Sequence, residues 1–161
     1  MQADPANANY GLEDVACNAS YAAEGYLPWR TLGVSEVDEW GTKRTGVASA
    51  WNGYWRYRID RNFTTAAIFS SSLLNTGVPW GADSLTVRDG SGNNLTSTTE
   101  RPIAIIFSTG ADLVANRQNA SFEPVNGIYE SDTNSSTFDD VAVWISRPVL
   151  VNRMVNAGKL P

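Results

Sequence analysis

Residues 54–60 alternate cleanly between apolar and polar side chains. The apolar positions are Trp55, Tyr57 and Ile59, and the charged positions are Arg56, Arg58 and Asp60. Successive side chains of a strand point to opposite faces, so this period of two is typical of a strand with one buried side. The pattern predicts that the aromatic and aliphatic side chains face the core and that the charged ones face solvent.

Four further segments have the composition of strands. Residues 84–88 and 94–99 flank the turn-rich run 89–93, and this arrangement predicts a β-hairpin. Residues 103–108 are almost continuously apolar, which is typical of a central strand buried on both faces. Residues 141–146 are the last predicted strand.

One short helix is predicted after the last strand, over residues 148–157. Leu150 and Met154 recur there at helical spacing, and we expect them to be buried against the sheet because so short a helix is marginal without tertiary packing. On that basis Leu150→Ala is expected to cost ~2–5 kcal/mol. The positions that suit a cap, a first turn and a terminator are Ser146, Pro148 and Gly158.

The other segments carry weaker signals. Residues 1–26 show no clear period and predict an irregular lead-in, whereas residues 109–137 are a long polar stretch. A pattern resembling a capping box at residues 35–40 predicts a single helical turn. Strands followed by one short helix predict a single α+β domain over residues 1–161, with a mostly antiparallel sheet.

Composition excludes several classes of chemistry. The chain has no histidine and one cysteine, Cys17, so it cannot build a Ser-His-Asp or Cys-His triad, a histidine-ligated metal site or an internal disulfide. Its net charge of −5 argues against a surface that tracks phosphates, and no nucleic-acid partner is expected. The densest basic group, Arg56, Arg58 and Arg61, is expected to lie on a solvated strand face.

No segment of the sequence has the length of a membrane helix. The longest apolar run, residues 103–107, is far shorter than the ~20 residues needed to cross a bilayer, and no signal-peptide pattern is present. The polar residues 2–7 directly after Met1 give the start the appearance of the cut end of a longer protein.

Three blocks of sequence, in this order, resemble a known family. The first block contains Gly-Tyr-Leu-Pro-Trp at 25–29, Thr-Leu-Gly at 31–33, Asp-Glu-Trp-Gly at 38–41 and the strand at 55–59. The second block is Ala-Ile-Ile-Phe-Ser-Thr-Gly at 104–110. The third block is Phe-Asp-Asp-Val-Ala-Val-Trp-Ile-Ser at 138–146, followed by Leu150, Asn-Arg-Met-Val at 152–155 and the ending Ala-Gly-Lys-Leu-Pro at 157–161. Together they resemble type IV pilin-like proteins, the minor pilins and pseudopilins that carry a prepilin cleavage and methylation signal.

The resemblance implies a pilin-like head domain that acts as a structural subunit and not as an enzyme. In that family a long N-terminal helix anchors the protein in the inner membrane and later packs in the core of a type IV pilus or a type II secretion pseudopilus. This sequence lacks that helix, and the resemblance implies that the helix was removed, which leaves Cys17 without an upstream partner. The implied partners are other pilin or pseudopilin subunits, and the inner membrane through the missing helix. The implied location is the cell envelope, with the head periplasmic or extracellular. No catalytic, cofactor-binding or metal-binding residue is assigned.

The adjacent carboxylates Asp139 and Asp140 are the most prominent acidic pair. Catalysis would require one of them to stay protonated while the other ionises, yet adjacent residues at the start of a strand point to opposite faces. We therefore favour a structural role, either as a turn cap or as a hydrogen-bonded carboxylate that fixes the loop before the last strand.

Two acidic groups are candidates for calcium, which prefers carboxylate and carbonyl oxygens. The first is Asp89, Ser91, Asn93 and Glu100, which match positions of a calcium loop; a hairpin explains the same residues, because Asn94 stands where the loop needs glycine. The second is Glu130, Asp132, Asp139 and Asp140. The resemblance favours this second group, since major pseudopilins bind calcium in their C-terminal loops. No cofactor is assigned, and calcium at this group stays open.

The aromatic residues support an alternative function, that of a secreted carbohydrate-binding β module. Flat rings stack on sugars, and the candidates are Trp51, Tyr54, Trp55, Tyr57 and Trp80. Burial in the core is the favoured account of Trp55 and Tyr57, because they alternate with charged residues. An enzyme of this composition would have to be a glycosidase that uses carboxylates alone.

Overall fold

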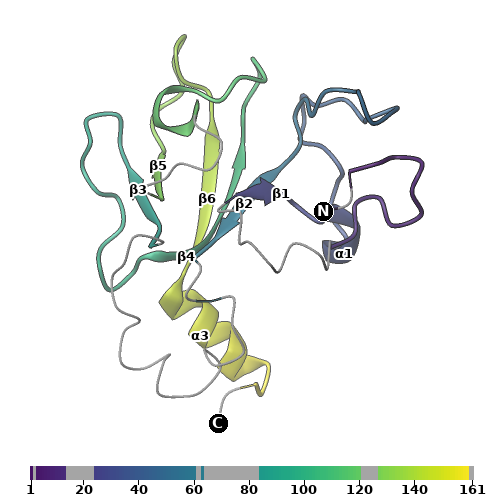
Figure 1. Cartoon of the computed structure of the whole chain (residues 1–161). Coiled ribbons are helices and arrows are strands. Elements are labelled where there is room, and N and C mark those ends of the chain that lie inside the picture. Colours follow the sequence, from purple (N-terminus) through teal and green to yellow (C-terminus); the bar gives the residue numbers. More distant parts are fainter. Residues whose placement is uncertain (2, 14–23, 61–62, 64–83, 121–126, 160–161) are drawn as a thin grey trace.

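The computed structural model in Figure 1 describes residues 1, 3–13, 24–60, 63, 84–120 and 127–159. They form a mixed α/β fold, with an antiparallel sheet and a short C-terminal helix, which is compatible with the expected α+β class. The elements in chain order are β1 (Gly25–Tyr26), α1 (Trp29–Leu32), β2 (Arg56–Ile59), β3 (Thr86–Arg88), β4 (Pro102–Ser108), the 3-10 helix η4 (Arg117–Ala120), β5 (Ile128–Glu130), β6 (Val141–Ser146) and α3 (Arg147–Asn156).

Two sheets make up the fold. The main sheet has the order β1-β2-β4-β6, and every neighbouring pair in it is antiparallel. The second sheet pairs β3 with β5 in parallel. The predicted strands at 54–60, 103–108 and 141–146 are thus confirmed as β2, β4 and β6, with β4 between the other two.

The hydrophobic core lies between the two sheets. Leu85 and Val87 from β3 and its approach, and Tyr129 from β5, pack against Ile105 and Phe107 of β4. Phe107 and Tyr129 meet edge to face, with ring centroids 6.2 Å apart, an arrangement that aromatic quadrupoles favour. The core therefore uses one face of the main sheet, and no sheet among the described residues covers the opposite face.

The face of β2 that enters this core is the charged one, and the sequence-based assignment of its two sides is wrong. Arg56 and Arg58 are only 7% and 4% exposed, and Asp60 is fully buried, whereas Ile59 is 41% exposed. Burial is possible because Glu24, which directly precedes β1, accepts hydrogen bonds from Arg56 and from the Tyr129 hydroxyl. A buried charge is tolerated where it is paired in this way.

Two further strand predictions need correction. Residues 84–88 do contribute β3, but its partner is β5, and residues 94–99 are not a strand. An isolated bridge between Arg88 and Asn94 is the remnant of the predicted hairpin. β5 lies inside the stretch 109–137 that the sequence predicts as polar and irregular, and β1 lies inside the predicted lead-in.

The C-terminal helix lies where it is predicted, within one residue at each end. Pro148 occupies its first turn, and Gly158 ends it in the left-handed conformation, with φ of +65°. Ser146 is at the N-cap position, although its side chain makes no capping hydrogen bond. The burial prediction is wrong: Leu150 and Met154 are half-buried, and no residue of α3 is fully buried.

The predicted helical turn at residues 35–40 is not found. A one-turn helix, α1, forms earlier and ends at Gly33 in the left-handed conformation. Cys17, Arg61 and Trp80, to which the sequence assigned possible roles, lie outside the described residues. Within the described part of the chain, none of the helices has both the length and the apolar character needed to cross a membrane.

Candidate functional site

The surface of the main sheet that faces away from β3 and β5 is apolar and open, and we call it the outer face. Period two places the side chains of β2, β4 and β6 on it in cross-strand rows, because Tyr57 pairs with Ile106 and Ile106 with Val143. Val143 is 59% exposed. The outer face consists of Tyr57, Ile59, Ala104, Ile106, Val141, Val143 and Ile145.

A loop closes one end of the outer face. Ser108, the last residue of β4, donates its hydroxyl proton to Asp38 over 2.6 Å. Asp38 also accepts the N–H groups of Trp40 and Gly41. Glycine is needed at both 41 and 53 because the two backbone segments pass close to each other: a Cβ on Gly41 would lie 2.7 Å from the Gly53 carbonyl oxygen, and a Cβ on Gly53 would lie 2.1 Å from the Gly41 Cα. The Ser108 hydroxyl and the two N–H groups at this end of the sheet are therefore hydrogen-bonded to Asp38, while the apolar side chains of β6 beside them stay exposed.

Sequence reasoning missed the outer face. It assigned Tyr57 and Ile59 to the core, and the sequence signal that could have found the face lies in β6. Positions 141–145 read Val-Ala-Val-Trp-Ile, so the residues that face each side of the strand are all apolar. A strand with a single buried side alternates with polar residues, so this run indicates that both faces of β6 are apolar.

Asp139 and Asp140 hold the loop between β4 and η4, and they do so through separate contacts. Asp139 accepts the N–H of Asp112 over 3.0 Å. Asp140 accepts the N–H of Asn116 over 2.9 Å and the side-chain amide of Asn119 over 3.0 Å. The favoured structural role of the pair is consistent with this geometry.

Burial raises the pKa of the Asp140 carboxyl, and the nearby charges of Asp139 and Asp112 act in the same direction. The hydrogen bonds from Asn116 and Asn119 offset this increase in part. Gly110 lies against the same pair with φ of +67°, and a Cβ there would be 2.4 Å from the Asp139 carbonyl oxygen. Glycine at position 110 allows the loop to approach the carboxylates.

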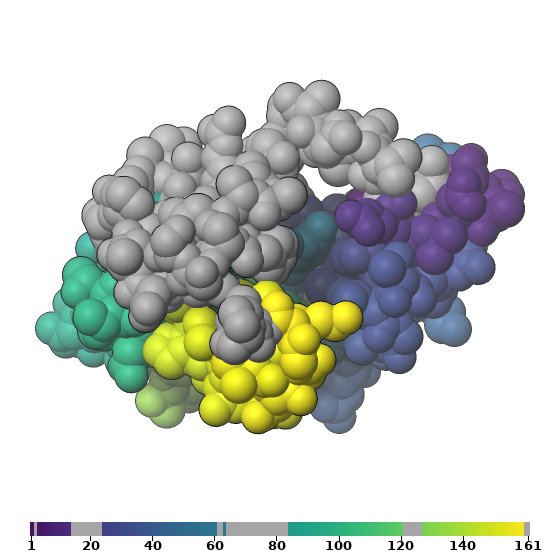
Figure 2. Space-filling model, turned by 90° about the horizontal axis from the view of Figure 1, so that it is seen from below, coloured from purple at the N-terminus to yellow at the C-terminus, as the bar shows by residue number. Residues whose placement is uncertain are grey.

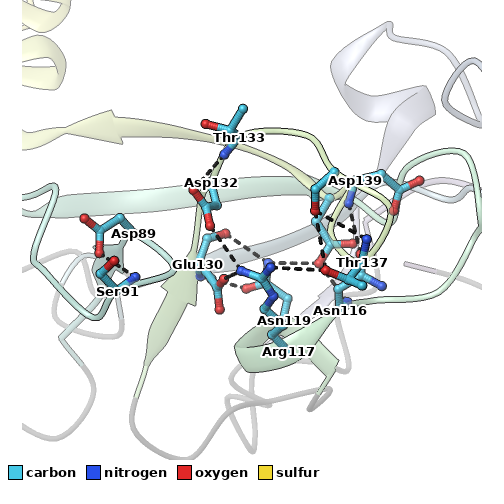
Figure 3. Close-up of polar contacts among 12 residues, drawn as sticks. Asp89, Ser91, Asn116, Arg117, Asn119, Glu130, Asp132, Thr133, Thr137 and Asp139 are labelled. Atoms are coloured by element: carbon cyan, nitrogen blue, oxygen red, sulfur yellow. Dashed lines mark hydrogen bonds and ion pairs between the residues drawn. The ribbon is translucent and has the colours of Figure 1, made fainter.

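Of the acidic residues considered for calcium, Glu130 and Asp132 lie apart from Asp139 (Figure 3). Arg117 lies between two of them, with its guanidinium 2.8 Å from Glu130 and 3.1 Å from Asp132. It also donates to Thr137, and the hydrogen bond to Glu130 raises the pKa of the guanidinium. Among the described residues, no three carboxylate, histidine or cysteine side chains are grouped as metal ligands. The cationic partner of this region is therefore Arg117.

The other calcium candidate, at 89–100, is a self-contained turn. The Asp89 carboxylate accepts the N–H groups of Ser91 and Asn93 and the side-chain amide of Asn93. These hydrogen bonds, with that of the Asn93 side chain first, lower the pKa of Asp89. Glu100 belongs to a different turn, in which its backbone N–H donates a hydrogen bond to the Ser97 hydroxyl. The structure brings three of the four residues together as a turn and leaves the fourth apart.

Among the aromatic candidates that the structure describes, Trp51 and Tyr54 offer no open platform. Tyr26 stacks on one face of the Trp51 indole at 4.1 Å between centroids, and the guanidinium of Arg44 lies 3.9 Å from the ring centre. Two groups this close must cover opposite faces of the ring, so no face of Trp51 is left for a sugar. Tyr54 is buried and bonded to the hydroxyl of Tyr10.

No family model matches this chain, and no significant similarity links it to a curated protein or to a solved structure.

Proposed function

We propose that this chain is the head domain of a filament subunit, a minor pilin or pseudopilin that assembles with related subunits in the cell envelope. Its native form would carry the N-terminal membrane helix that the family resemblance implies. The observation that carries the proposal is the outer face, an apolar surface on the structural sheet that a subunit can use for packing. An isolated soluble module has little need for such a surface.

The positions of the resemblance blocks in the fold support the same proposal. The first block supplies Asp38, which accepts the hydroxyl of Ser108 from the second block. The second block supplies Gly110, which lies against Asp139 of the third block. β4 and β6, from the second and third blocks, pair along six residues of β6. Residues that match the family pattern therefore contact one another in the fold.

The carbohydrate-binding alternative is less well supported. It needs aromatic rings with a free face, whereas Trp51 is covered on both faces and Tyr54 is buried. Tyr57 does lie on the outer face, but its cross-strand neighbour there is Ile106, and the polar side chain beside them on β4, Ser108, is already bonded to Asp38. Sugar sites combine a stacking ring with polar groups that bind hydroxyls, and the outer face offers aliphatic side chains instead.

The experiment compares two valine-to-lysine variants of the full-length chain in its native cells. Val143→Lys adds a charge to the outer face in the middle of its edge strand β6, and Val47→Lys adds the same charge to a loop valine that is 64% exposed. Because both sites are open, both variants are expected to fold with near-normal stability. We expect Val143→Lys to be absent from the sheared filament fraction and Val47→Lys to be present at the level of the unmodified chain. Equal recovery of both variants would show that the outer face is not an assembly surface.

A further inference from the structure

The charge of this acidic chain is distributed unevenly along its C-terminal half. Residues 109–140 contain six acidic residues and one basic residue, whereas residues 141–161 contain three basic residues and no acidic one. The second segment is therefore a cationic region of a protein whose net charge is −5. Opposite charges within one chain matter for assembly only if the fold separates them in space.

The fold places the two charged segments at opposite ends of the main sheet. β6 starts at the acidic loops and continues directly into α3, and its six residues span about 20 Å. Ser108 of β4 leads into the loop that holds Asp112 at the first end, while Pro102 lies beside Ser146 at the second. Figure 1 shows α3 at the bottom of the sheet, and the segment that follows β4 and the loop that precedes β6 at its top. We call the top of the sheet the acidic end; it carries Asp89, Asp112, Asp132 and Asp139. We call α3 together with the residues directly after it the basic helix; it carries Arg147, Arg153 and Lys159.

The basic helix is accessible to a partner. Arg153 and Lys159 are exposed, and so are Val149 and Val155, at 48% and 52%. Figure 2, which views the molecule from the α3 side, shows the C-terminal residues as a lobe on the surface. Exposed valines flanked by cations suit a partner surface that is acidic and partly apolar.

The acidic end has the complementary character. Asp112 and Asp132 are exposed, and Val114 beside them is 60% exposed. Arg117 neutralises only part of the charge there, because it pairs with Glu130 and Asp132 but not with Asp112 or Asp139. Each end thus presents a net charge of one sign together with an exposed valine.

We infer that the heads of this chain associate head to tail, with the basic helix of one copy on the acidic end of the next. Such a contact is heterologous, because it joins two different surfaces, and it can repeat without closing. The inference goes beyond the proposed function, since it concerns the two ends of the head and not the outer face. Exposed ion pairs are weak, so the dissociation constant for isolated heads is expected to be about 1 mM at low salt.

The test uses two variants that each block one end. Arg153→Glu with Lys159→Glu reverses the charge of the basic helix, and Ala111→Lys with Asn134→Lys adds two positive charges to the acidic end at exposed positions. The matched controls are Lys43→Glu and Ala50→Lys, which make the same kinds of change in the loop between α1 and β2. Self-association of the 161-residue chain is measured by sedimentation equilibrium at about 1 mM protein, in low and high salt.

Each blocked variant alone should associate at least about fivefold more weakly than the unmodified chain at low salt, and the controls should not. An equimolar mixture of the two blocked variants retains one intact basic helix and one intact acidic end, and should form pairs that do not grow. Three results would overturn the inference: no salt-sensitive attraction in the unmodified chain, no recovery in the mixture, or equal losses in the controls. A fourth result would assign the basic helix to a membrane instead. In that case the unmodified chain would bind vesicles of anionic lipid, the Arg153→Glu, Lys159→Glu variant would not bind them, and no self-association would be seen.

The outcome is independent of the proposed function. Recovery in the mixture, combined with normal filament incorporation of Val143→Lys, would retain the head-to-tail contact and reject the outer face as the assembly surface. The opposite combination would retain the outer face and reject the head-to-tail contact.

Discussion

At the scale of single residues, the main feature is the buried pairing of Glu24, Arg56 and Tyr129. The Arg56 guanidinium also lies over the Phe107 ring, 4.4 Å from its centre, so the aliphatic stem and the charged group are both accommodated in the core. Alternation along 54–60 predicted the strand correctly, but it could not predict which side is buried. The deciding residue, Glu24, is 32 positions away from Arg56 and carries no local signal.

The first residue-scale prediction concerns this pair. Arg56→Met keeps an unbranched apolar stem but removes the ion-pair partner of the buried Glu24 carboxylate, which keeps the Tyr129 hydroxyl as a donor and the nearby charge of Arg58. Loss of one member of a buried ion pair typically costs about 3–5 kcal/mol, and we expect a destabilisation of that size in urea unfolding. Arg153→Met, on the exposed surface of α3, is the control and should change stability by less than about 0.5 kcal/mol. If Arg56→Met and Arg153→Met lowered the stability by equally small amounts, Arg56 would have to lie on a solvated face of the strand.

The second residue-scale prediction concerns pH. Burial raises the folded-state pKa of Asp140, so its contribution favours the folded protein below the unfolded pKa of about 3.9 and is lost as pH rises through the folded pKa. The unfolding free energy of the unmodified chain minus that of Asp140→Asn should therefore fall as pH increases above about 4.

Asp89 supplies the comparison of opposite sign. Its folded-state pKa is lowered, so its contribution is present above the unfolded pKa and is lost as pH falls through the folded pKa. The same difference measured with Asp89→Asn should rise with pH. Parallel profiles for the two variants would contradict the assigned environments of these carboxylates.

At the scale of elements, local signals predicted the C-terminal helix well and its packing poorly. Pro148 and Gly158 fix its ends because their backbone preferences act locally. Burial depends on what lies opposite the helix, and α3 continues directly from an edge strand of the sheet, where less of it is covered. The number of half-buried positions could not be inferred from the spacing of Leu150 and Met154.

The element-scale prediction follows from that partial burial. Leu150→Ala should cost about 1 kcal/mol, less than the value for a core leucine, because only part of the side chain leaves water on folding. Leu85→Ala, at a fully buried core position, should cost about 2–5 kcal/mol in the same measurement. A larger loss at position 150 than at position 85 would mean that α3 is integral to the core.

Strand prediction was limited by partners that are distant in sequence. β4 and β6 were found because each is a long apolar run. β5 is three residues long and lies within a polar segment, and it pairs in parallel with β3, which no turn signal can indicate. The hairpin residues 89–93 do make the predicted turn, through Asp89, but the chain that leaves it forms only the bridge at Asn94.

At the scale of the whole molecule, the chain combines an apolar outer face, an acidic end and a basic helix with net charge −5. We predict that the 161-residue head is a monomer at micromolar concentrations and forms no filaments. Like charge disfavours close approach, and head-to-head contacts without a membrane helix should be small and transient. Light scattering measures this directly. A stable oligomer whose size does not depend on concentration would contradict it.

The central claim is that this head belongs to a filament subunit, and the most direct measurement is mass spectrometry of the native protein purified from its cells. The proposal predicts that the intact chain is recovered in the sheared filament fraction. It also predicts a processed N-terminus followed by ~20 apolar residues upstream of this head. Recovery of the chain free in the periplasm or medium, with an N-terminus left by a cleaved secretory signal and no apolar helix, would contradict the proposal and favour a secreted binding module.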